Sequence, residues 1–295
     1  MRLDSAQLNA FATVIDEGSF ERAAAVLHVT RSAVSQRVKL LEERVGQVLV
    51  RRATPCTPTE AGQALYRHAR EVALSEADAL ATLGGGQHAS MRLALGVNAD
   101  SLATWFPHAM AQAAEGQGIT FDIHVEDQDP SANLLREGRV MAAVTADPQP
   151  VQGCKVLPLG TLRYRALASP AFLQRHFAQG VNAATLAQAP MLVFNRKDAL
   201  QARFVGRITR RKLAPPVHWL PEANAFVMAS RAGLGWGMTP DPMVRHDLEA
   251  GTLVELIPGK PVDVPLYWQY WRLNVQALHH MTAAVLQAAA LTLLR

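Results

Sequence analysis

Apolar positions in the first 58 residues repeat at the spacing of short helices. Three helices are predicted, with apolar faces made of Leu8, Phe11, Val14 and Ile15, of Phe20, Ala23, Ala24 and Leu27, and of Val34, Val38 and Leu41. Gly18 and Ser19 break the chain before the second helix, and Thr30 can cap the third. Residues 48–50 and 55–58 indicate a small hairpin, or wing. The pattern therefore predicts a small helical unit with a short β-ribbon.

A single longer helix is predicted from Thr59 to about Leu83. Its apolar seam is narrow and contains small side chains, namely Leu65, Ala69, Val72, Ala73, Ala77 and Leu80. Such a seam suits the pairing of two helices better than burial in a globular core. Three glycines, 84–86, end this helix, and residues 84–90 are interpreted as a hinge.

From Met91 onwards the pattern changes to strands that alternate with helices. Two strands are predicted from alternating apolar residues, namely Met91, Leu93, Leu95 and Val97, and Ile119, Phe121, Ile123 and Val125. A helical stretch, residues 102–114, lies between them, and the alternation continues to the C-terminus. This order predicts an α/β domain with a wound parallel sheet.

Length and composition support a folded protein of two or three compact units. The chain has 295 residues, of which 49% are hydrophobic. We find no signal peptide and no apolar run long enough for a membrane span, so the expected compartment is the cytoplasm. Cys56 and Cys154 match no metal-binding or redox spacing.

Charge is distributed unevenly, although the formal net charge is only +4. Residues 20–52 hold seven Lys or Arg and three Asp or Glu, whereas residues 120–135 hold four acids and no Lys or Arg. The first segment is suited to phosphate groups and the second to a cation.

The segment FERAAAVLHVTRSAVSQRVKLLEERVG has the layout of a helix-turn-helix, whose second helix can enter a DNA major groove. Arg31 and Gln36 can pair with base edges, and Ser32 and Ser35 with bases or phosphates. The side chains suited to the DNA backbone are Arg37, Lys39, Arg51 and Arg52. The alternative is a solvated polar face on an ordinary three-helix bundle.

The stretches GSFERAAAVLHVTRSAVSQRVKLLEERVGQVLV and TPTEAGQAL closely resemble the N-terminal domain of LysR-type transcriptional regulators. The family layout covers the whole chain. It implies a winged helix-turn-helix domain, a long dimerisation helix, a hinge and a two-lobed effector domain shaped like a periplasmic binding protein. The corresponding ranges are 1–58, 59–83, 84–90 and 91–295, with lobe I at about 91–163 and 266–295 and lobe II at about 164–265.

The resemblance also implies partners and contact residues. Such regulators are homodimers or homotetramers that bind an interrupted inverted repeat in double-stranded DNA, respond to a small co-inducer and act on transcription, so RNA polymerase is a further candidate partner. The family's base-contacting helix falls on Thr30 to Lys39, and its wing on Arg51 and Arg52. Arg31 stands where many members carry Gln, which shifts the expected base preference from adenine towards guanine.

The segment VNADSLATWF, residues 97–106, predicts a carboxylate site, because a strand ends at Val97 and a helix begins near Ser101. Free backbone N–H groups at a helix start attract anions, and Asn98 and Ser101 can add side-chain donors. We include Asn98, Asp100 and Ser101 among the candidate effector residues. The alternative is plain capping, in which Asp100 or Ser101 satisfies its own helix start.

Acidic side chains follow the next predicted strands, at the edge where ligands bind in open α/β sheets. Glu126, Asp127 and Asp129 can attract a cation, and Asp147 can join them; the alternative is a solvated acidic loop. A carboxylate site beside a cation site predicts a zwitterion with an extra positive charge, such as lysine or arginine.

Further segments resemble the lysine- and arginine-responsive branch of the family, the ArgP/LysG type. They are VNADSLATW, VED, EANAF at 222–226 and LYW at 266–268, which add Asn224 and Trp268 to the candidate effector residues. Members of that branch control the export or metabolism of basic amino acids. The basic residues Arg203, Arg207, Arg210, Arg211 and Lys212 are interpreted as a solvated helix face.

Other classes of protein fit the sequence less well than a ligand-responsive regulator does. An enzyme would need a nucleophile with its base, a metal cluster or a cofactor motif, and the sequence has no GxSxG, HExxH or Walker loop. We therefore predict no catalytic residues, no metal and no cofactor. A transport protein would need a signal peptide. A regulator with a different effector, and an architectural DNA-binding protein without one, stay as alternatives.

Overall fold

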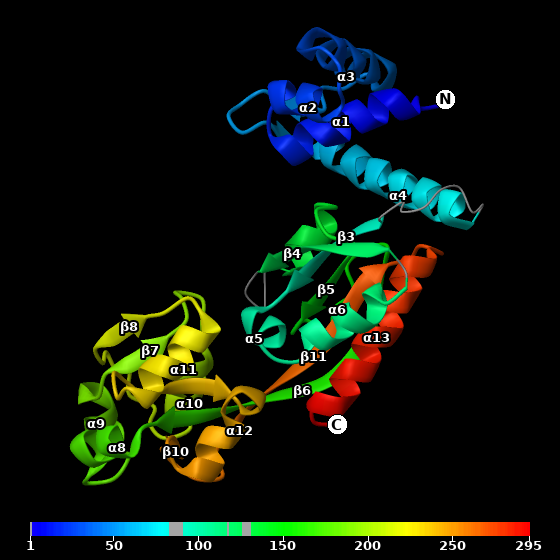
Figure 1. The fold of residues 1–295 in the computed structure, drawn as a ribbon. Coiled ribbons are helices and arrows are strands. Elements are labelled where there is room, and N and C mark those ends of the chain that lie inside the picture. The colour runs from blue at the N-terminus through cyan, green and yellow to red at the C-terminus, as the bar shows by residue number, and fades with distance from the viewer. Residues whose placement is uncertain (1, 83–90, 117, 126–130) are drawn as a thin grey trace.

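The computed structural model describes residues 2–82, 91–116, 118–125 and 131–295. Figure 1 shows a small helical domain, a long helix beside it, and an α/β domain with two lobes. In the described part of the chain, no helix is long and apolar enough to cross a membrane.

The N-terminal domain has the predicted helices and the predicted wing. Its elements are α1 (Ser5–Glu17), α2 (Phe20–Val26), α3 (Arg31–Val45), β1 (Val50–Arg51) and β2 (Thr57–Pro58). Ser19 and Thr30 cap α2 and α3 with their hydroxyl groups, as predicted. The strands β1 and β2 pair antiparallel and form the wing. Phe11 is fully buried where the three helices meet, because its face of α1 packs on both other helices.

The long helix α4 (Glu60–Thr82) is confirmed, and the hydroxyl oxygen of Thr59 accepts a hydrogen bond from the Gly62 backbone N–H at 3.0 Å. Its apolar residues do not form one uniform seam. Leu65 and Ala69 pack into the core of the N-terminal domain, whereas Ala77 packs on the core of the α/β domain. Ala73 and Leu80 are exposed. The predicted hinge, residues 84–90, lies outside the described residues.

The α/β domain begins with β3 and alternates strands with helices. Its first half contains β3 (Met91–Val97), α5 (Ala99–Leu102), α6 (Phe106–Ala114), β4 (Ile119–Val125), α7 (Ser131–Arg136), β5 (Ala142–Thr145), β6 (Cys154–Ala168), α8 (Pro170–Phe177) and α9 (Ala183–Gln188). Its second half contains β7 (Met191–Val193), α10 (Leu200–Gly206), β8 (Val217–Trp219), α11 (Ala223–Arg231), β9 (Gly237–Pro240), α12 (Asp241–Ala250), β10 (Val254–Glu255), β11 (Val262–Trp271) and α13 (Gln276–Thr292). The helix predicted over 102–114 is split into α5 and α6.

Within the described residues, seven strands form one sheet in the order β10-β6-β11-β5-β3-β4, with β9 also paired to β6. The strands β3, β4 and β5 are parallel, but β11 is antiparallel to both β5 and β6. The sheet is therefore mixed, and the prediction of a parallel sheet holds only for part of it.

Two long strands connect the lobes. At one end, β11 pairs with β5 in the lobe that also contains β3, β4 and α13, and at the other end β6 pairs with β9 and β10. Figure 1 shows β6 and β11 running side by side from one lobe into the other. The second lobe also contains the small parallel pair β7 and β8 with the helices α8 to α12. Strand ends and helix starts from both lobes thus surround the space between the lobes.

Candidate functional sites

The first candidate site is the outward face of α3. Val34, Val38 and Leu41 are fully buried and fix the rotation of the helix against α1 and α2. The predicted DNA-contacting residues lie on the remaining faces. Arg31, Ser32, Gln36 and Lys39 are exposed, and Ser35 and Arg37 are half-buried.

Several of these side chains have local partners. The Thr30 hydroxyl accepts from the Ala33 backbone N–H at 3.2 Å and lies 2.9 Å from the Ser32 hydroxyl, so Thr30 acts first as a cap. Lys39 forms an exposed ion pair with Glu43 at 3.6 Å, which water screens and DNA phosphate can displace.

The wing brings two further cations to the same domain. Arg51 is exposed on β1, and the Arg52 guanidinium lies 5.3 Å from the centre of the Phe20 ring. A capped helix with an exposed polar face, flanked by a cationic hairpin, has the chemistry that base edges and phosphates require.

The second candidate site is a cleft between the lobes with a volume of about 350 Å³. The first lobe and its connections contribute Asn98, Ala99, Asp100 and Ala146. The other lining residues are Phe194, Lys197, Asp198, Ala199, Leu200, Arg203, Ala223, Phe226, Met238, Thr239, Pro240, Met243, Val264 and Pro265. The volume is in the range of small-molecule sites, and the cleft is lined by charged, polar and apolar side chains.

Two lining residues are buried polar groups without a partner among the described residues. Asn98 is 3% exposed, and neither atom of its side-chain amide makes a hydrogen bond; Thr239 is 1% exposed, and its hydroxyl makes none. Asn98 occupies the cap position of α5 but does not cap it with its side chain. The fully buried Ser101 hydroxyl next to the cleft also has no partner in the described structure. Because unmade buried hydrogen bonds are costly, these groups indicate that the cleft receives a polar ligand.

The charged residues of the cleft have both signs. Asp100 accepts a hydrogen bond from the Tyr164 hydroxyl at 2.7 Å, which joins α5 to the long strand β6. Asp198 accepts from the backbone N–H groups of Phe194 and Leu200 at 3.1 and 3.0 Å and so orders the loop before α10. Capping by Asp100 was the alternative explanation at α5, but its carboxylate is directed to Tyr164 instead.

Two cations line the same cleft. Lys197 lies in the loop before α10 and Arg203 lies on α10 itself. Arg203 donates to the Asp263 backbone carbonyl at 3.2 Å, which ties α10 to β11.

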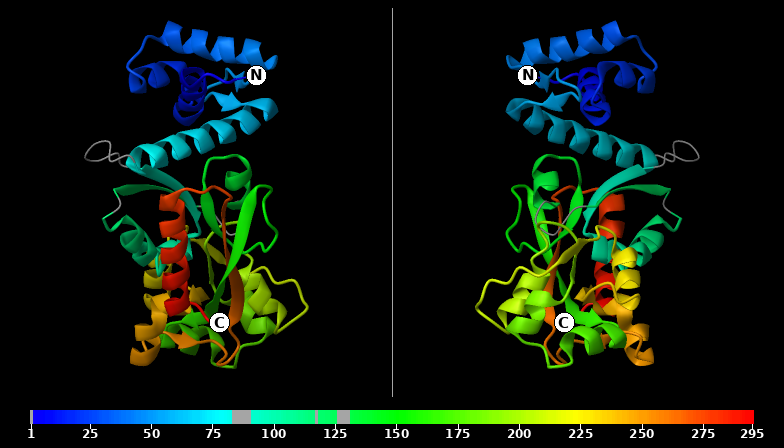
Figure 2. Two further views of the ribbon diagram at one scale, coloured as in Figure 1. Left: turned by 90° about the vertical axis from the view of Figure 1, so that its right-hand side faces the viewer. Right: turned by 90° about the vertical axis from the view of Figure 1, so that its left-hand side faces the viewer.

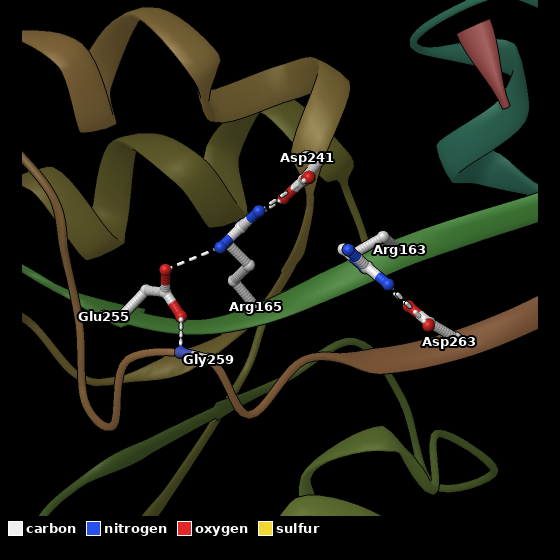
Figure 3. A network of polar contacts seen from close by, with 6 residues as sticks. All are labelled: Arg163, Arg165, Asp241, Glu255, Gly259 and Asp263. Atoms are coloured by element: carbon white, nitrogen blue, oxygen red, sulfur yellow. Dashed lines mark hydrogen bonds and ion pairs between the residues drawn. The ribbon is translucent and has the colours of Figure 1, made fainter. Parts of the chain in front are cut away.

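A network of ion pairs stiffens the wall that the second lobe contributes (Figure 3). Arg165 on β6 donates to Asp241, at the start of α12, and to Glu255 on β10 at 2.6 Å. Asp241 follows the lining residue Pro240 directly, so the network holds the end of β9 and the start of α12 in place. Hydrogen bonds from Arg165 to the Asp241 carboxylate raise the pKa of Arg165.

A separate cross-strand ion pair lies two residues away along β6. Arg163 binds the Asp263 carboxylate at 2.9 and 2.8 Å, and the two residues are direct register partners on β6 and β11 (Figure 3). Hydrogen bonding to Arg163 lowers the pKa of Asp263, so the carboxylate stays charged at neutral pH. This pair clamps the two connecting strands beside the lining residue Val264.

Four of the predicted effector residues that the structure describes do not line the cleft, namely Ser101, Asp147, Asn224 and Trp268. The side chain of Ser101 is fully buried. Trp268 is fully buried on β11, which lies between β5 and β6, and its indole N–H donates to Thr282 on α13 at 3.1 Å. Asn224 lies in the first turn of α11, where its amide groups donate to Glu222. Asp147 closes its own turn by accepting from the Gln149 backbone N–H at 2.9 Å.

Their neighbours do reach the cleft. Ala223, which precedes Asn224 in the chain, lines the cleft, and so does Ala146, which precedes Asp147. The predicted cation site of Glu126, Asp127 and Asp129 lies outside the described residues.

Lining residues that sequence reasoning missed come mainly from the second lobe. They are Phe194, Lys197, Asp198, Phe226, Met243 and Thr239, together with Arg203, which was interpreted as part of a solvated helix face. No local pattern distinguishes these positions. Two signals were available. The turn sequence Asn195 to Asp198 predicts an ordered loop but no ligand, and the segment EANAF, which resembles the lysine- and arginine-responsive branch, extends to Phe226.

Both parts of the chain match known protein families. Residues 5–63 match the family of bacterial regulatory helix-turn-helix proteins of the lysR type, and residues 86–290 match the LysR substrate binding domain. The fold and the two sites thus define a DNA-binding transcriptional regulator with a separate ligand-binding domain.

The relatives cover the whole chain. A transcriptional regulator named LysG from Mycobacterium tuberculosis is 47% identical over 291 residues, which are 98% of this chain and 94% of the relative. The crystal structure of ArgP from Mycobacterium tuberculosis has a TM-score of 0.88 at 47% identity and covers 100% of this chain and 99% of its own. Full-length LysG from Corynebacterium glutamicum with bound effector Arg has a TM-score of 0.81 at 40% identity, covering 99% and 100%. This chain belongs to the LysR family of transcriptional regulators.

Proposed function

We propose that this regulator senses a basic amino acid, lysine or arginine, in the cleft between its lobes, and controls genes for the export or metabolism of basic amino acids. The observation that carries the proposal is the pair of buried, unpartnered polar groups, Asn98 and Thr239, in a cleft with charges of both signs. A similar protein, LysG of Corynebacterium glutamicum, has been solved with arginine as its effector.

The cleft offers a complement for each part of such a ligand. The backbone N–H groups at the start of α5, the Asn98 amide and Lys197 are suited to the α-carboxylate. Asp100 and Asp198 are suited to the cationic groups. Phe226 and other apolar side chains can cover the alkyl stem, and burial of methylene groups adds affinity.

The same proposal assigns the operator contacts. Arg31, Ser32, Ser35 and Gln36 on α3 contact bases, whereas the cations Arg37, Lys39, Arg51 and Arg52 contact phosphates. A homodimer or homotetramer would place two such helices on an interrupted inverted repeat, because symmetric proteins read symmetric sites. We expect this regulator to act in the cytoplasm, where its DNA is, without catalytic activity.

Calorimetric titration of the full-length chain tests the proposal. Lysine, arginine and ornithine should each bind saturably, and leucine should give no heat of binding, because leucine lacks the second cation. No measurable heat of binding with any of the three basic amino acids would contradict the proposal. Binding of leucine with equal affinity would show that the cleft does not select a charged side chain.

A matched pair of variants assigns the binding to the cleft. Lys197→Met should weaken all basic amino acids by about tenfold or more, because it removes a cation at the proposed carboxylate site. Arg211→Met removes a cation from the same lobe at an exposed position that does not line the cleft, and should leave affinity unchanged. Equal behaviour of the two variants would contradict the assignment.

A further inference from the structure

The helix α4 belongs to two hydrophobic cores at once. Tyr66 and Ala69 are buried in the core of the N-terminal domain, and Leu74 is buried in the core of the α/β domain. Figure 2 shows α4 lying between these two parts of the molecule. A displacement of the α/β domain against α4 therefore changes the packing of α4 on the N-terminal domain, because packed cores do not deform freely.

One side chain of α4, Arg67, makes several contacts with the α/β domain. Its guanidinium donates to the Gln152 backbone carbonyl at 2.8 Å and lies 5.4 Å from the centre of the Trp271 ring. Glu71, one helical turn further on, accepts from the Arg67 Nε at 3.1 Å and holds the guanidinium in this orientation. Trp271 is fully buried, so this cation–π contact is shielded from water on the ring side.

The α/β domain approaches Arg67 with glycines. A Cβ atom at Gly153, where φ is +79°, would lie 2.5 Å from a guanidinium nitrogen of Arg67. A Cβ atom at Gly138, where φ is +70°, would lie 3.0 Å from the Arg67 backbone. The fit around Arg67 is thus close enough that small movements of the turn at 152–153 change its contacts.

Both segments that meet Arg67 also line the effector cleft at their other ends. The connection from β5 to β6 includes the lining residue Ala146 and ends at Gln152. The strand β11 includes the lining residues Val264 and Pro265 and ends at Trp271. Arg67 therefore contacts the far ends of two segments whose near ends form the cleft wall.

A buried side-chain amide connects these two segments. Gln269 on β11 is fully buried and donates to the backbone carbonyls of Asp147 and Gln149 at 3.0 and 2.9 Å. Its oxygen accepts from the Val151 backbone N–H at 3.0 Å. The connection at 146–152 is thus fastened to β11 along its length.

We propose that Arg67 is the positioning residue through which occupancy of the effector cleft changes the affinity of the N-terminal domain for DNA. This inference rests on the proposed effector function and adds the route of its regulation. When the lobes settle on a ligand, Ala146 and Val264 shift, the turn at 152–153 and Trp271 shift with them, and Arg67 transfers the change to α4. Coupling of this kind acts in both directions, so bound DNA must also change effector affinity by the same factor.

The test measures two affinities on full-length protein. Calorimetry gives the affinity for lysine, and titration of a DNA fragment selected from a random pool by the wild-type chain gives operator affinity with and without saturating lysine. The coupling ratio is the quotient of the two operator affinities, and in proteins such ratios are commonly about 5 to 150.

Arg67→Met should keep lysine affinity within about threefold and bring the coupling ratio close to 1. Arg67→Lys, which keeps the charge but loses the planar contact with Trp271, should give an intermediate ratio. Arg70→Met is the matched control, because Arg70 lies on the same helix but pairs with Asp16 in the N-terminal domain at 3.4 Å. It should leave the ratio unchanged.

If Arg67→Met does not fold, Glu71→Gln removes the neighbouring anchor with little change in shape and should lower the ratio as well. The proposal is overturned if Arg67→Met and Glu71→Gln both have the same coupling ratio as the wild-type chain. It is also overturned if the wild-type chain binds lysine without any change in operator affinity. Absence of lysine and arginine binding in calorimetry contradicts the proposed function instead, so the two failures are distinguishable.

Discussion

The two functional surfaces of this protein are built in opposite ways. The DNA-contacting surface comes mainly from one continuous helix, α3, whose functional side chains point away from a small core. The effector cleft collects residues from Asn98 to Pro265, on loops, strand ends and helix starts of two lobes. A surface of the first kind can be recognised from local spacing, whereas a surface of the second kind depends on how distant segments are brought together.

The difference also concerns how each surface is held. On α3, cations are exposed and weakly paired, as the Lys39 contact to Glu43 illustrates, so they are available to a large partner. Around the cleft, ion pairs such as that between Arg163 and Asp263 connect neighbouring strands, and buried polar groups are left for a small ligand. Substitutions in the two regions should therefore separate cleanly into effects on DNA and effects on effector.

The largest effect is expected on α3. The double change Ser35→Ala with Gln36→Ala should weaken binding to the selected operator by about 100-fold or more, because each base contact contributes roughly 1–3 kcal/mol. Binding to unrelated DNA, measured in the same titration at the same salt concentration, should change by less than about threefold. Equal loss on both DNAs would show that these side chains do not select bases.

The next largest effect is expected in the cleft. Asp100→Asn should lower lysine affinity by about 10- to 100-fold, since hydrogen bonds to charged groups contribute roughly 1.5–3 kcal/mol. Operator affinity without effector should stay at the wild-type value. Calorimetry with lysine checks the first statement, and an unaltered dissociation constant would remove Asp100 from the proposed site.

A smaller effect is expected from the residue that positions Asp100. Tyr164→Phe removes the hydroxyl that donates to Asp100 at 2.7 Å and keeps the buried ring. Lysine affinity should fall by about three- to tenfold, because the carboxylate loses orientation but not charge. In the Asp100→Asn background the same change should have less effect, and full additivity in this double-mutant cycle would contradict a shared role.

The smallest effect concerns stability at Asp247 on α12, a second-lobe residue that does not line the cleft. Asp247 is 5% exposed and accepts two hydrogen bonds from Arg231 at 2.7 Å, which lower its pKa. A lowered pKa in the folded state contributes stability above the unfolded pKa of about 3.9, and this contribution is lost as pH falls through the folded value.

The corresponding measurement is thermal unfolding of Asp247→Asn against the wild-type chain. The variant should be less stable by about 1 kcal/mol at pH 7, and the difference should shrink as the pH is lowered below about 4. A difference that stays constant across this pH range would mean that packing, and not charge, causes the loss.

Much of the N-terminal domain was predictable. The spacing of Val34, Val38 and Leu41 fixes which face of α3 is buried, and Ser19 and Thr30 mark where two helices start. In the α/β domain, alternating residues located β3 and β4, and Val97 was correctly expected to end a strand. Each of these predictions depends on residues that lie within one or two helical turns of each other, or along one strand.

The cleft was predictable only where one segment carries the signal. Asn98 and Asp100 were expected because a strand ends and a helix begins beside them. Arg203 is exposed, as the predicted solvated helix face requires, and it also lines the cleft, because a cation on a short helix has the same local pattern in both situations. Trp268 was misassigned to the cleft, because its sequence does not tell that β5 and β6 flank β11.

The chain alone thus determined the class of protein, the DNA-contacting helix, the long helix and the start of α5. These features follow from helix and strand periodicity and from capping, which act over a few residues. Tertiary structure decided which side chains of the second lobe meet Asn98 and Asp100, and that Arg67 contacts two segments that begin at the cleft. Such contacts depend on the register of β6 with β11 and on the packing of α4 between two cores, where residues separated by up to about 200 positions along the chain become neighbours.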